Sequence, residues 1–267
     1  MYQFDFVRAT SVSEAASALA ANPDAKLLAG GQTLLPTLKQ RLAQPSSVVD
    51  LAAISDLKSI RMDGNTVVIG AMTTHAEVEA SGDVKSSIPA LAKLAGGIGD
   101  PQVRHRGTLG GSLANNDPSA DYPAAVLALN AVIVTNKRQI SADDYFAGMF
   151  TTALQDDEIM TEVRFPQPAF AGYAKIEQRA SRYPLVGVFV ARPAENPNEV
   201  RVAVTGAGAD GVFRSQPIEA ALAGNFTGSA ARTVSVDPSA LLGDLHGSAE
   251  YRAALISVLA QRAVDGG

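Results

Sequence analysis

The segment Leu28–Pro36, with the sequence LAGGQTLLP, sets two adjacent glycines between a short apolar strand and the start of a helix. Glycine tolerates positive φ and lets the backbone approach a ligand closely. Successive N–H groups in such a turn form an anion-binding concavity, which a helix N-terminus reinforces. Gln32 and Thr33 add hydrogen-bonding side chains. The segment therefore indicates an anion site, although an ordinary strand–helix turn has the same pattern.

A second glycine segment lies roughly 80 residues further on, at 107–123, with the sequence GTLGGSLANNDPSADYP. Its small and polar residues predict a loop or tight turn region. Gly110-Gly111 repeats the glycine pair of the first segment, and Asp121 has a side chain that accepts hydrogen bonds from ribose or polyol hydroxyls. Asp117 precedes Pro118, which favours a turn over a catalytic role. Neither segment is a P-loop or a GxGxxG motif, but together they could hold one pyrophosphate from two sides.

The rest of the chain predicts two domains, residues 1–170 and 171–267. Within the first domain, residues 1–55 predict a β-α-β-α-β unit, and residues 56–170 predict a mixed region that opens with a hairpin at Asp63-Gly64-Asn65. Pro166-Gln167-Pro168 predicts the linker. Beyond it, three strands followed by helices indicate a C-terminal α+β domain.

Composition excludes several classes of site. The 267 residues contain no cysteine, which rules out disulfides, thiolate-bound iron–sulfur clusters and a cysteine nucleophile on this chain. The three histidines, His75, His105 and His246, lie far apart, so we expect no metal site. A net charge of −5 argues against nucleic acid as a partner. No apolar run reaches the roughly 20 residues of a membrane helix, and we expect a cytoplasmic protein.

The two glycine segments together resemble those of the FAD-binding, or medium, subunits of the molybdenum hydroxylases, a family that includes the carbon monoxide dehydrogenase medium subunit and the xanthine dehydrogenase flavin domain. The resemblance extends over essentially the whole chain. It includes 4–6 (FDF), 70–74 (GAMTT), 102–106 (QVRHR), 173–175 (YAK) and 179–183 (RASRY).

The resemblance implies an α+β fold, in which a two-part FAD-binding domain of the vanillyl-alcohol-oxidase/PCMH type precedes a smaller α+β domain with an antiparallel sheet. It implies that the pyrophosphate is bound by Ala29, Gly30, Gly31, Gln32, Thr33 and Leu34 and by Gly107, Thr108, Gly110, Gly111, Ser112 and Asn115. Asp121 would bind the ribityl or ribose hydroxyls, and Ile98 and Ile159 would lie near the flavin. Lys175 would stabilise the reduced flavin, and Tyr183 would stack on the ring.

In function, the resemblance implies an electron-transfer subunit. A large subunit would carry the molybdopterin cofactor, a small subunit would carry the iron–sulfur clusters, and the complex would be a dimer of heterotrimers. The final acceptor, whether NAD⁺, a quinone or O₂, stays open. Gln32, Ser112 and Ser181-Arg182 differ from residues frequent in the family. Two alternatives remain: a stand-alone FAD oxidoreductase of the broader superfamily, and a non-catalytic assembly or nucleotide-binding subunit, which substitutions such as Gln32 and Ser112 leave open.

The histidines and one acidic run have simpler interpretations. His75 follows Thr74 at the start of a helix with a capping-box pattern, and we expect it on the surface. His105 lies between two arginines, where it could favour a phosphate or an acidic partner or be merely solvated. His246 is expected in a loop, and Asp156-Asp157-Glu158 in an acidic turn.

Overall fold

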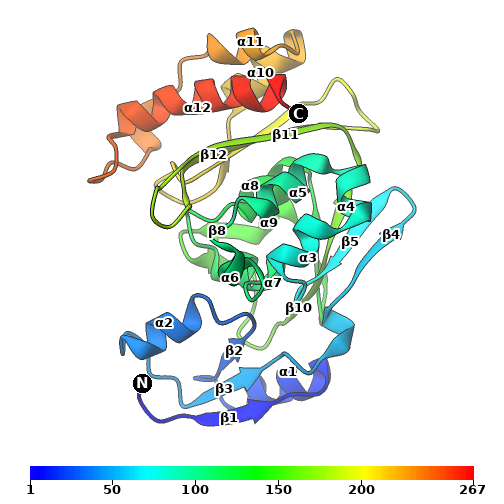
Figure 1. Cartoon of the computed structure of the whole chain (residues 1–267), viewed down its shortest axis with the longest axis vertical. Coiled ribbons are helices and arrows are strands. Elements are labelled where there is room, and N and C mark those ends of the chain that lie inside the picture. The colour runs from blue at the N-terminus through cyan, green and yellow to red at the C-terminus, as the bar shows by residue number, and fades with distance from the viewer.

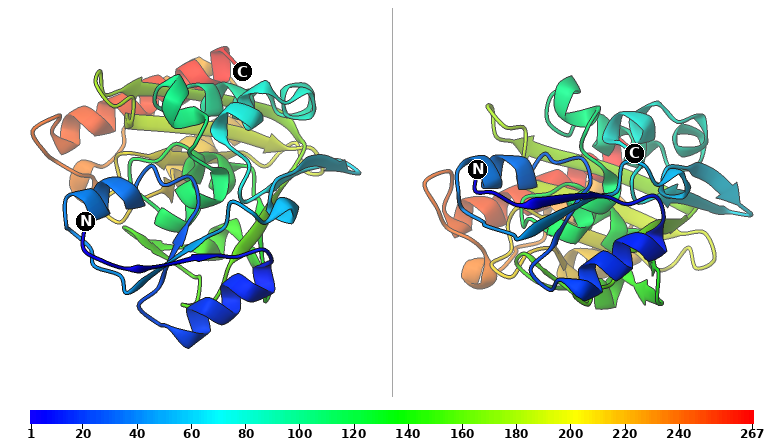
Figure 2. Two further views of the ribbon diagram at one scale, coloured as in Figure 1. Left: turned by 60° about the horizontal axis from the view of Figure 1, so that its bottom comes forward. Right: turned by 90° about the horizontal axis from the view of Figure 1, so that it is seen from below.

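The computed structural model describes all residues, 1–267, and arranges them as three successive sheets with their helices (Figure 1). The first sheet is parallel, in the order β1-β3-β2, and its strands are β1 (Asp5–Arg8), β2 (Lys26–Leu28) and β3 (Ser47–Asp50). The helices α1 (Val12–Ala21) and α2 (Leu34–Lys39) lie on opposite sides of these strands (Figure 2). This is the predicted β-α-β-α-β unit. Val49, Ala15 and Leu19 belong to its core.

The second sheet is antiparallel and has the order β4-β5-β10-β6-β7. Its strands are β4 (Ile60–Asp63), β5 (Thr66–Gly70), β6 (Val132–Thr135), β7 (Gln139–Ser141) and β10 (Met160–Pro166). The associated helices are α3 (His75–Ala80), α4 (Gly82–Ser87), α5 (Pro89–Gly96), α6 (Pro101–Arg104), α7 (Leu109–Asn115), α8 (Tyr122–Ala128) and α9 (Ala142–Tyr145). Smaller elements are the 3-10 turn Ser55–Leu57 and the hairpin of β8 (Phe146–Gly148) and β9 (Thr151–Thr152).

The third sheet is antiparallel, in the order β11-β12-β13-β14. Its strands are β11 (Pro168–Glu177), β12 (Pro184–Pro193), β13 (Arg201–Thr205) and β14 (Phe213–Arg214). It is followed by α10 (Gln216–Gly224), α11 (Gly228–Arg232), the 3-10 turn Pro238–Ala240 and α12 (Ala249–Asp265). Figure 1 shows α10 to α12 on the outer side of β11 and β12, with α5 and α8 on the inner side. Only Gln167 separates β10 from β11, and the predicted domain boundary after residue 170 falls inside β11.

The α+β fold class is confirmed, but the expectation of a loop over 107–123 was wrong. Leu109–Asn115 is the helix α7, capped by the Thr108 hydroxyl, which accepts a hydrogen bond from Gly111 N–H at 3.1 Å. Glycine disfavours a helix, but here Gly110 N–H donates to the carbonyl of Ala71 at 2.8 Å, and tertiary contact overrides the local preference. No helix in the structure combines the length and the apolar character needed to cross a membrane.

Candidate functional site

The two glycine segments are in direct contact, although roughly 80 residues separate them in the sequence. A Cβ on Gly30 would lie 2.0 Å from the carbonyl oxygen of Arg106 and 2.8 Å from the Cα of Gly107. A Cβ on Gly111 would lie 3.5 Å from the Cβ of Ala29. The distance at Gly111 is an ordinary van der Waals contact, but at Gly30 only glycine allows the two backbones to approach this closely.

The first segment presents a row of N–H groups with no acceptor in the protein. The backbone N–H groups from Gly30 to Thr33 donate to no backbone or side-chain oxygen of the chain. Gly31 has a φ of +72°, in the left-handed region. Thr33 is the N-cap residue of α2, but its side chain forms no capping hydrogen bond. Adjacent donors of this kind suit a multiply charged anion such as a pyrophosphate.

The second segment is anchored to the end of β5 by its first residues. Leu109 N–H donates to the carbonyl of Thr73 at 3.0 Å, and Thr108 pairs with Thr74 in an isolated bridge. The side chains of Ser112 and Asn115 are partly exposed and make no hydrogen bond within the chain. They can therefore form hydrogen bonds with a ligand, and Gly111, the neighbour of Ser112, faces Ala29 of the first segment.

A buried polar group lies where α8 meets β11. Lys175 Nζ donates to the carbonyl of Gly97, to Asp121 Oδ1 and to the carbonyl of Arg182, each at 2.8 Å. Tyr173 donates to the same Asp121 oxygen at 2.7 Å. Burial raises the pKa of Asp121, while the Lys175 ammonium and the Tyr173 hydroxyl oppose that rise. All three donors of Lys175 are thus in use, which the sequence did not indicate.

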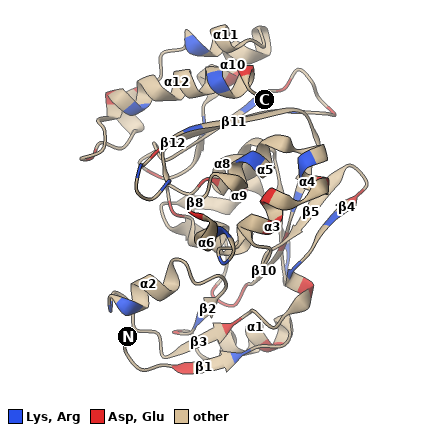
Figure 3. Ribbon diagram, in the orientation of Figure 1, with Lys and Arg blue, Asp and Glu red and all other residues tan.

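The turn between β11 and β12 carries Tyr183 and lies over the segment Gly97–Gly99. Lys175 and Arg182 both contact this segment, and Arg104 binds the carbonyls of Ile98 at 3.2 Å and Gly99 at 3.1 Å. Tyr183 is 43% exposed. Figure 3 shows basic residues in this turn. The structure therefore brings Ile98, Asp121, Lys175 and the turn of Tyr183 together.

Ile159 is placed differently from the other predicted residues. It is 1% exposed and belongs to the core of the first sheet, against which Ala29 packs. Its N–H donates to Asn136 Oδ1 at 2.8 Å. The side chain therefore belongs to the apolar core beside the first glycine segment, and its contact with a flavin stays a prediction.

The expectation that His75 lies on the surface was wrong. Its side chain is 5% exposed, and its ring centroid lies 5.4 Å from that of Tyr122. Burial, with a smaller contribution from the charge of Arg104, lowers the pKa of His75 to about 4. One local signal existed: Val78, three residues later on the same helical face, is apolar and also buried. His105 and His246 are both exposed.

The acidic run before β10 holds a structural ion pair. Glu158 is buried and accepts from Arg138 Nε at 3.0 Å and from the Thr135 hydroxyl at 2.7 Å. These partners hold the pKa of Glu158 at about 2, the Arg138 hydrogen bond being the largest cause. Asp157 pairs with Lys137. The expected acidic turn is present, and its role is to fix the β6–β7 turn.

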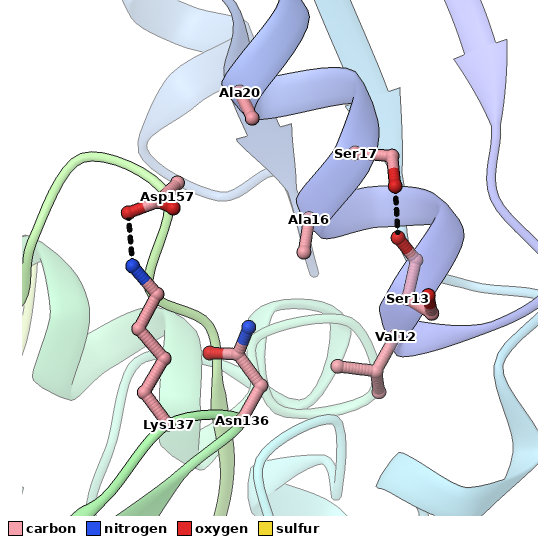
Figure 4. A pocket seen from close by; sticks show the side chains of 8 residues that line it. All are labelled: Val12, Ser13, Ala16, Ser17, Ala20, Asn136, Lys137 and Asp157. Atoms are coloured by element: carbon pink, nitrogen blue, oxygen red, sulfur yellow. Dashed lines mark hydrogen bonds and ion pairs between the residues drawn. The ribbon is translucent and has the colours of Figure 1, made fainter.

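None of the predicted site residues lines a cavity of about 530 Å³ (Figure 4). It separates α1 from the β6–β7 turn and is lined by Val12, Ser13, Ala16, Ser17, Ala20, Asn136, Lys137 and Asp157. Its walls hold one ion pair and mostly small side chains, with no converging set of unpartnered polar groups. The chemistry of the molecule therefore points to the glycine segments and not to this cavity.

Known proteins are similar to this chain over nearly its full length. The family model described as FAD binding domain in molybdopterin dehydrogenase matches residues 2–168. The nicotine 6-hydroxylase medium subunit of Paenarthrobacter nicotinovorans is 37% identical, over 95% of this chain and 93% of that protein. The carbon monoxide dehydrogenase medium chain of Hydrogenophaga pseudoflava is 35% identical, over 98% and 96%. A solved carbon monoxide dehydrogenase from H. pseudoflava, which lacks the Mo-pyranopterin moiety, superposes with a TM-score of 0.88 at 36% identity, covering 99% of this chain and 96% of that chain.

Proposed function

Since the chain belongs to the family of FAD-binding domains in molybdopterin dehydrogenases, we propose that it is the electron-transfer subunit of a molybdenum-containing hydroxylase or dehydrogenase. As a member of this family it is an oxidoreductase subunit that binds FAD. Its proposed place is between the iron–sulfur clusters of one partner and an external acceptor. When bound, FAD supplies the redox chemistry that protein side chains lack.

The row of acceptor-free N–H groups between Gly30 and Thr33 is the observation that supports this proposal most. Such donors fit the pyrophosphate of FAD, and the segment beginning at Gly107 packs against them. We assign the pyrophosphate to Ala29–Leu34 on one side and to Gly107–Ser112 on the other, with Asn115 at the end of α7. An anion site of this kind needs no cation, because oriented amides supply the positive potential.

Lys175 has a second proposed role besides its charge. Since its three donors already bind Gly97, Asp121 and Arg182, it ties α5, α8 and the β11–β12 turn around one point. We propose that Lys175 orients Ile98 and Tyr183 toward the flavin and adds positive potential beside it. Asp121 Oδ1 is occupied by Lys175 and Tyr173, so only its other oxygen, Oδ2, is assigned to the sugar or ribityl hydroxyls.

The proposed partners are a large molybdopterin-binding subunit and a small iron–sulfur subunit, assembled as a dimer of heterotrimers. The proposal draws on the relatives, which are named as medium chains or medium subunits. It also draws on the absence of cysteine from the 267 residues, which leaves thiolate-bound clusters to another chain. The substrate would then be oxidised on the partner, not in the cavities of this chain.

The visible absorption spectrum of the chain, purified from its host without denaturants, tests the proposal. A flavin spectrum with added iron–sulfur absorption is expected, because a cysteine-free chain shows the latter only with its partner bound. A colourless protein that takes up no added FAD would instead favour the assembly-subunit alternative. Oxidation of an organic substrate by the isolated flavoprotein would favour the stand-alone oxidoreductase.

A further inference from the structure

Four residues form a continuous stack that runs from the first glycine segment into the core. Gly30 lies against Gly107, whose Cα would be 2.8 Å from a Cβ on Gly30. Gly107 in turn lies against His75, whose Nε2 would be 2.5 Å from a Cβ on Gly107. The imidazole of His75 contacts the ring of Tyr122, with 5.4 Å between the centroids and 48° between the planes.

The backbone ties His75 to the same segment. His75 N–H donates to the carbonyl of Gly107 at 3.0 Å, next to the bridge between Thr74 and Thr108. The capping box of Thr74 and Glu77 fixes the first turn of α3, with Thr74 N–H donating to Glu77 Oε2 at 2.7 Å. His75 therefore has little freedom to move away from Gly107.

The interior of the stack holds two polar atoms that bond to nothing in the protein. His75 Nδ1 and the Tyr122 hydroxyl are both buried without a hydrogen-bond partner. Buried polar atoms in this state cost folding free energy, so an apolar side chain would serve a purely structural core better. Burial keeps His75 neutral near pH 7, because its pKa is about 4. A neutral ring can press against the glycine backbone without drawing the anion away from the N–H groups.

We infer that His75 is a positioning residue for the phosphate clamp: backed by Tyr122, its imidazole holds Gly107 against Gly30 and so sets the spacing of the two glycine segments. This inference rests on the proposed function, because the clamp is defined by FAD. His75 itself touches no ligand in this account and acts only through Gly107. Its contribution therefore appears in FAD affinity rather than in the redox step.

A double-substitution test in the full chain separates this role from a general effect on folding. The FAD dissociation constant is measured by flavin fluorescence for Gly107→Ala, His75→Ala and the double variant, at a temperature where circular dichroism shows each apoprotein folded. Gly107→Ala is expected to weaken binding at least tenfold, and His75→Ala at least threefold. In the double variant the new methyl enters the space left by the imidazole, so binding is expected to be at least fivefold tighter than in Gly107→Ala. His246→Ala, at an exposed histidine, is the matched control and is expected to bind like the wild type.

Two results would overturn the inference: wild-type affinity in His75→Ala, or a double variant that binds no more tightly than Gly107→Ala. If Gly107→Ala fails to fold, His75→Phe replaces it, because the phenyl ring keeps the bulk behind Gly107. It is expected to bind FAD more tightly than His75→Ala, and equal affinities would then refute the positioning role. Failure of the wild-type chain to bind FAD would instead refute the proposed function.

Discussion

Gly30→Ala is the substitution that tests the contact between the two glycine segments most directly. The added Cβ would meet the Arg106 carbonyl oxygen at 2.0 Å and the Gly107 Cα at 2.8 Å. Both atoms belong to backbone, so neither can rotate away as a side chain would. To reach an ordinary contact of 3.4 Å, the segments must separate by roughly 1.4 Å.

An N–H···O hydrogen bond keeps its strength only at about 2.7–3.2 Å between heavy atoms, so a displacement of this size moves donor and acceptor out of that range. A pyrophosphate held by one segment would therefore lose its bonds to the other. Hydrogen bonds to charged groups contribute about 1.5–3 kcal/mol each. Loss of two such bonds amounts to at least about 3 kcal/mol, which corresponds to an FAD dissociation constant raised on the order of 100-fold.

Equilibrium titration of the apoprotein with FAD, followed by flavin fluorescence, measures this effect. Gly82→Ala is the matched control, because a Cβ on Gly82 would meet nothing within 4 Å. Gly82 lies in the first turn of α4. The control is expected to bind FAD like the wild type and to be slightly more stable, since alanine favours a helix over glycine. Wild-type affinity in Gly30→Ala, with the protein folded, would refute the assignment of the clamp.

Three further outcomes are expected. Lys175→Met is expected to lower the flavin midpoint potential by about 30 mV for every 1.4 kcal/mol of stabilisation that the two-electron reduced state loses, and an unchanged potential in a spectroelectrochemical titration would contradict its flavin role. The substitution is also expected to destabilise the fold, because Asp121 loses its buried cation. Burial holds the pKa of His75 at about 4 in the folded chain, so the unfolded chain, with the ordinary value of 6.5, takes up the proton at higher pH, and the free energy of unfolding is expected to fall by about 3 kcal/mol from pH 6.5 to 4. Urea unfolding of His75→Phe is expected to show a free energy of unfolding without this fall. Arg138 lowers the pKa of Glu158 to about 2, so the contribution of Glu158 to the free energy of unfolding is present above pH 4.5 and is lost toward pH 2. Glu158→Gln is expected to be less stable than the wild type by about 3 kcal/mol at pH 7, and a difference in stability of the same size at pH 2 would argue against the ion pair as the cause.

Features that depend on neighbours in the chain could be predicted from the sequence. The Thr74-x-x-Glu77 pattern forms the expected capping box, and Asp63-Gly64-Asn65 forms the expected hairpin turn, with φ of +57° at Gly64. Each depends on hydrogen bonds or dihedral angles within about four residues. The two glycine pairs indicated an anion site for the same reason, and their combination identified the family over nearly the full length.

What only the tertiary structure decided concerns partners that lie far apart in sequence. The contact of Gly30 with Gly107, the burial of His75 beneath that contact, and the full use of the Lys175 donors by Gly97, Asp121 and Arg182 have no local signature. The helix α7 also escaped prediction, because its glycines disfavour a helix until tertiary contacts, such as the bond from Gly110 N–H to the Ala71 carbonyl, offset that preference. A hydrophobic pattern or a capping motif indicates only the local structure of one helix or strand. The spacing of two loops is set by atoms of both, so it exists only once the chain has folded.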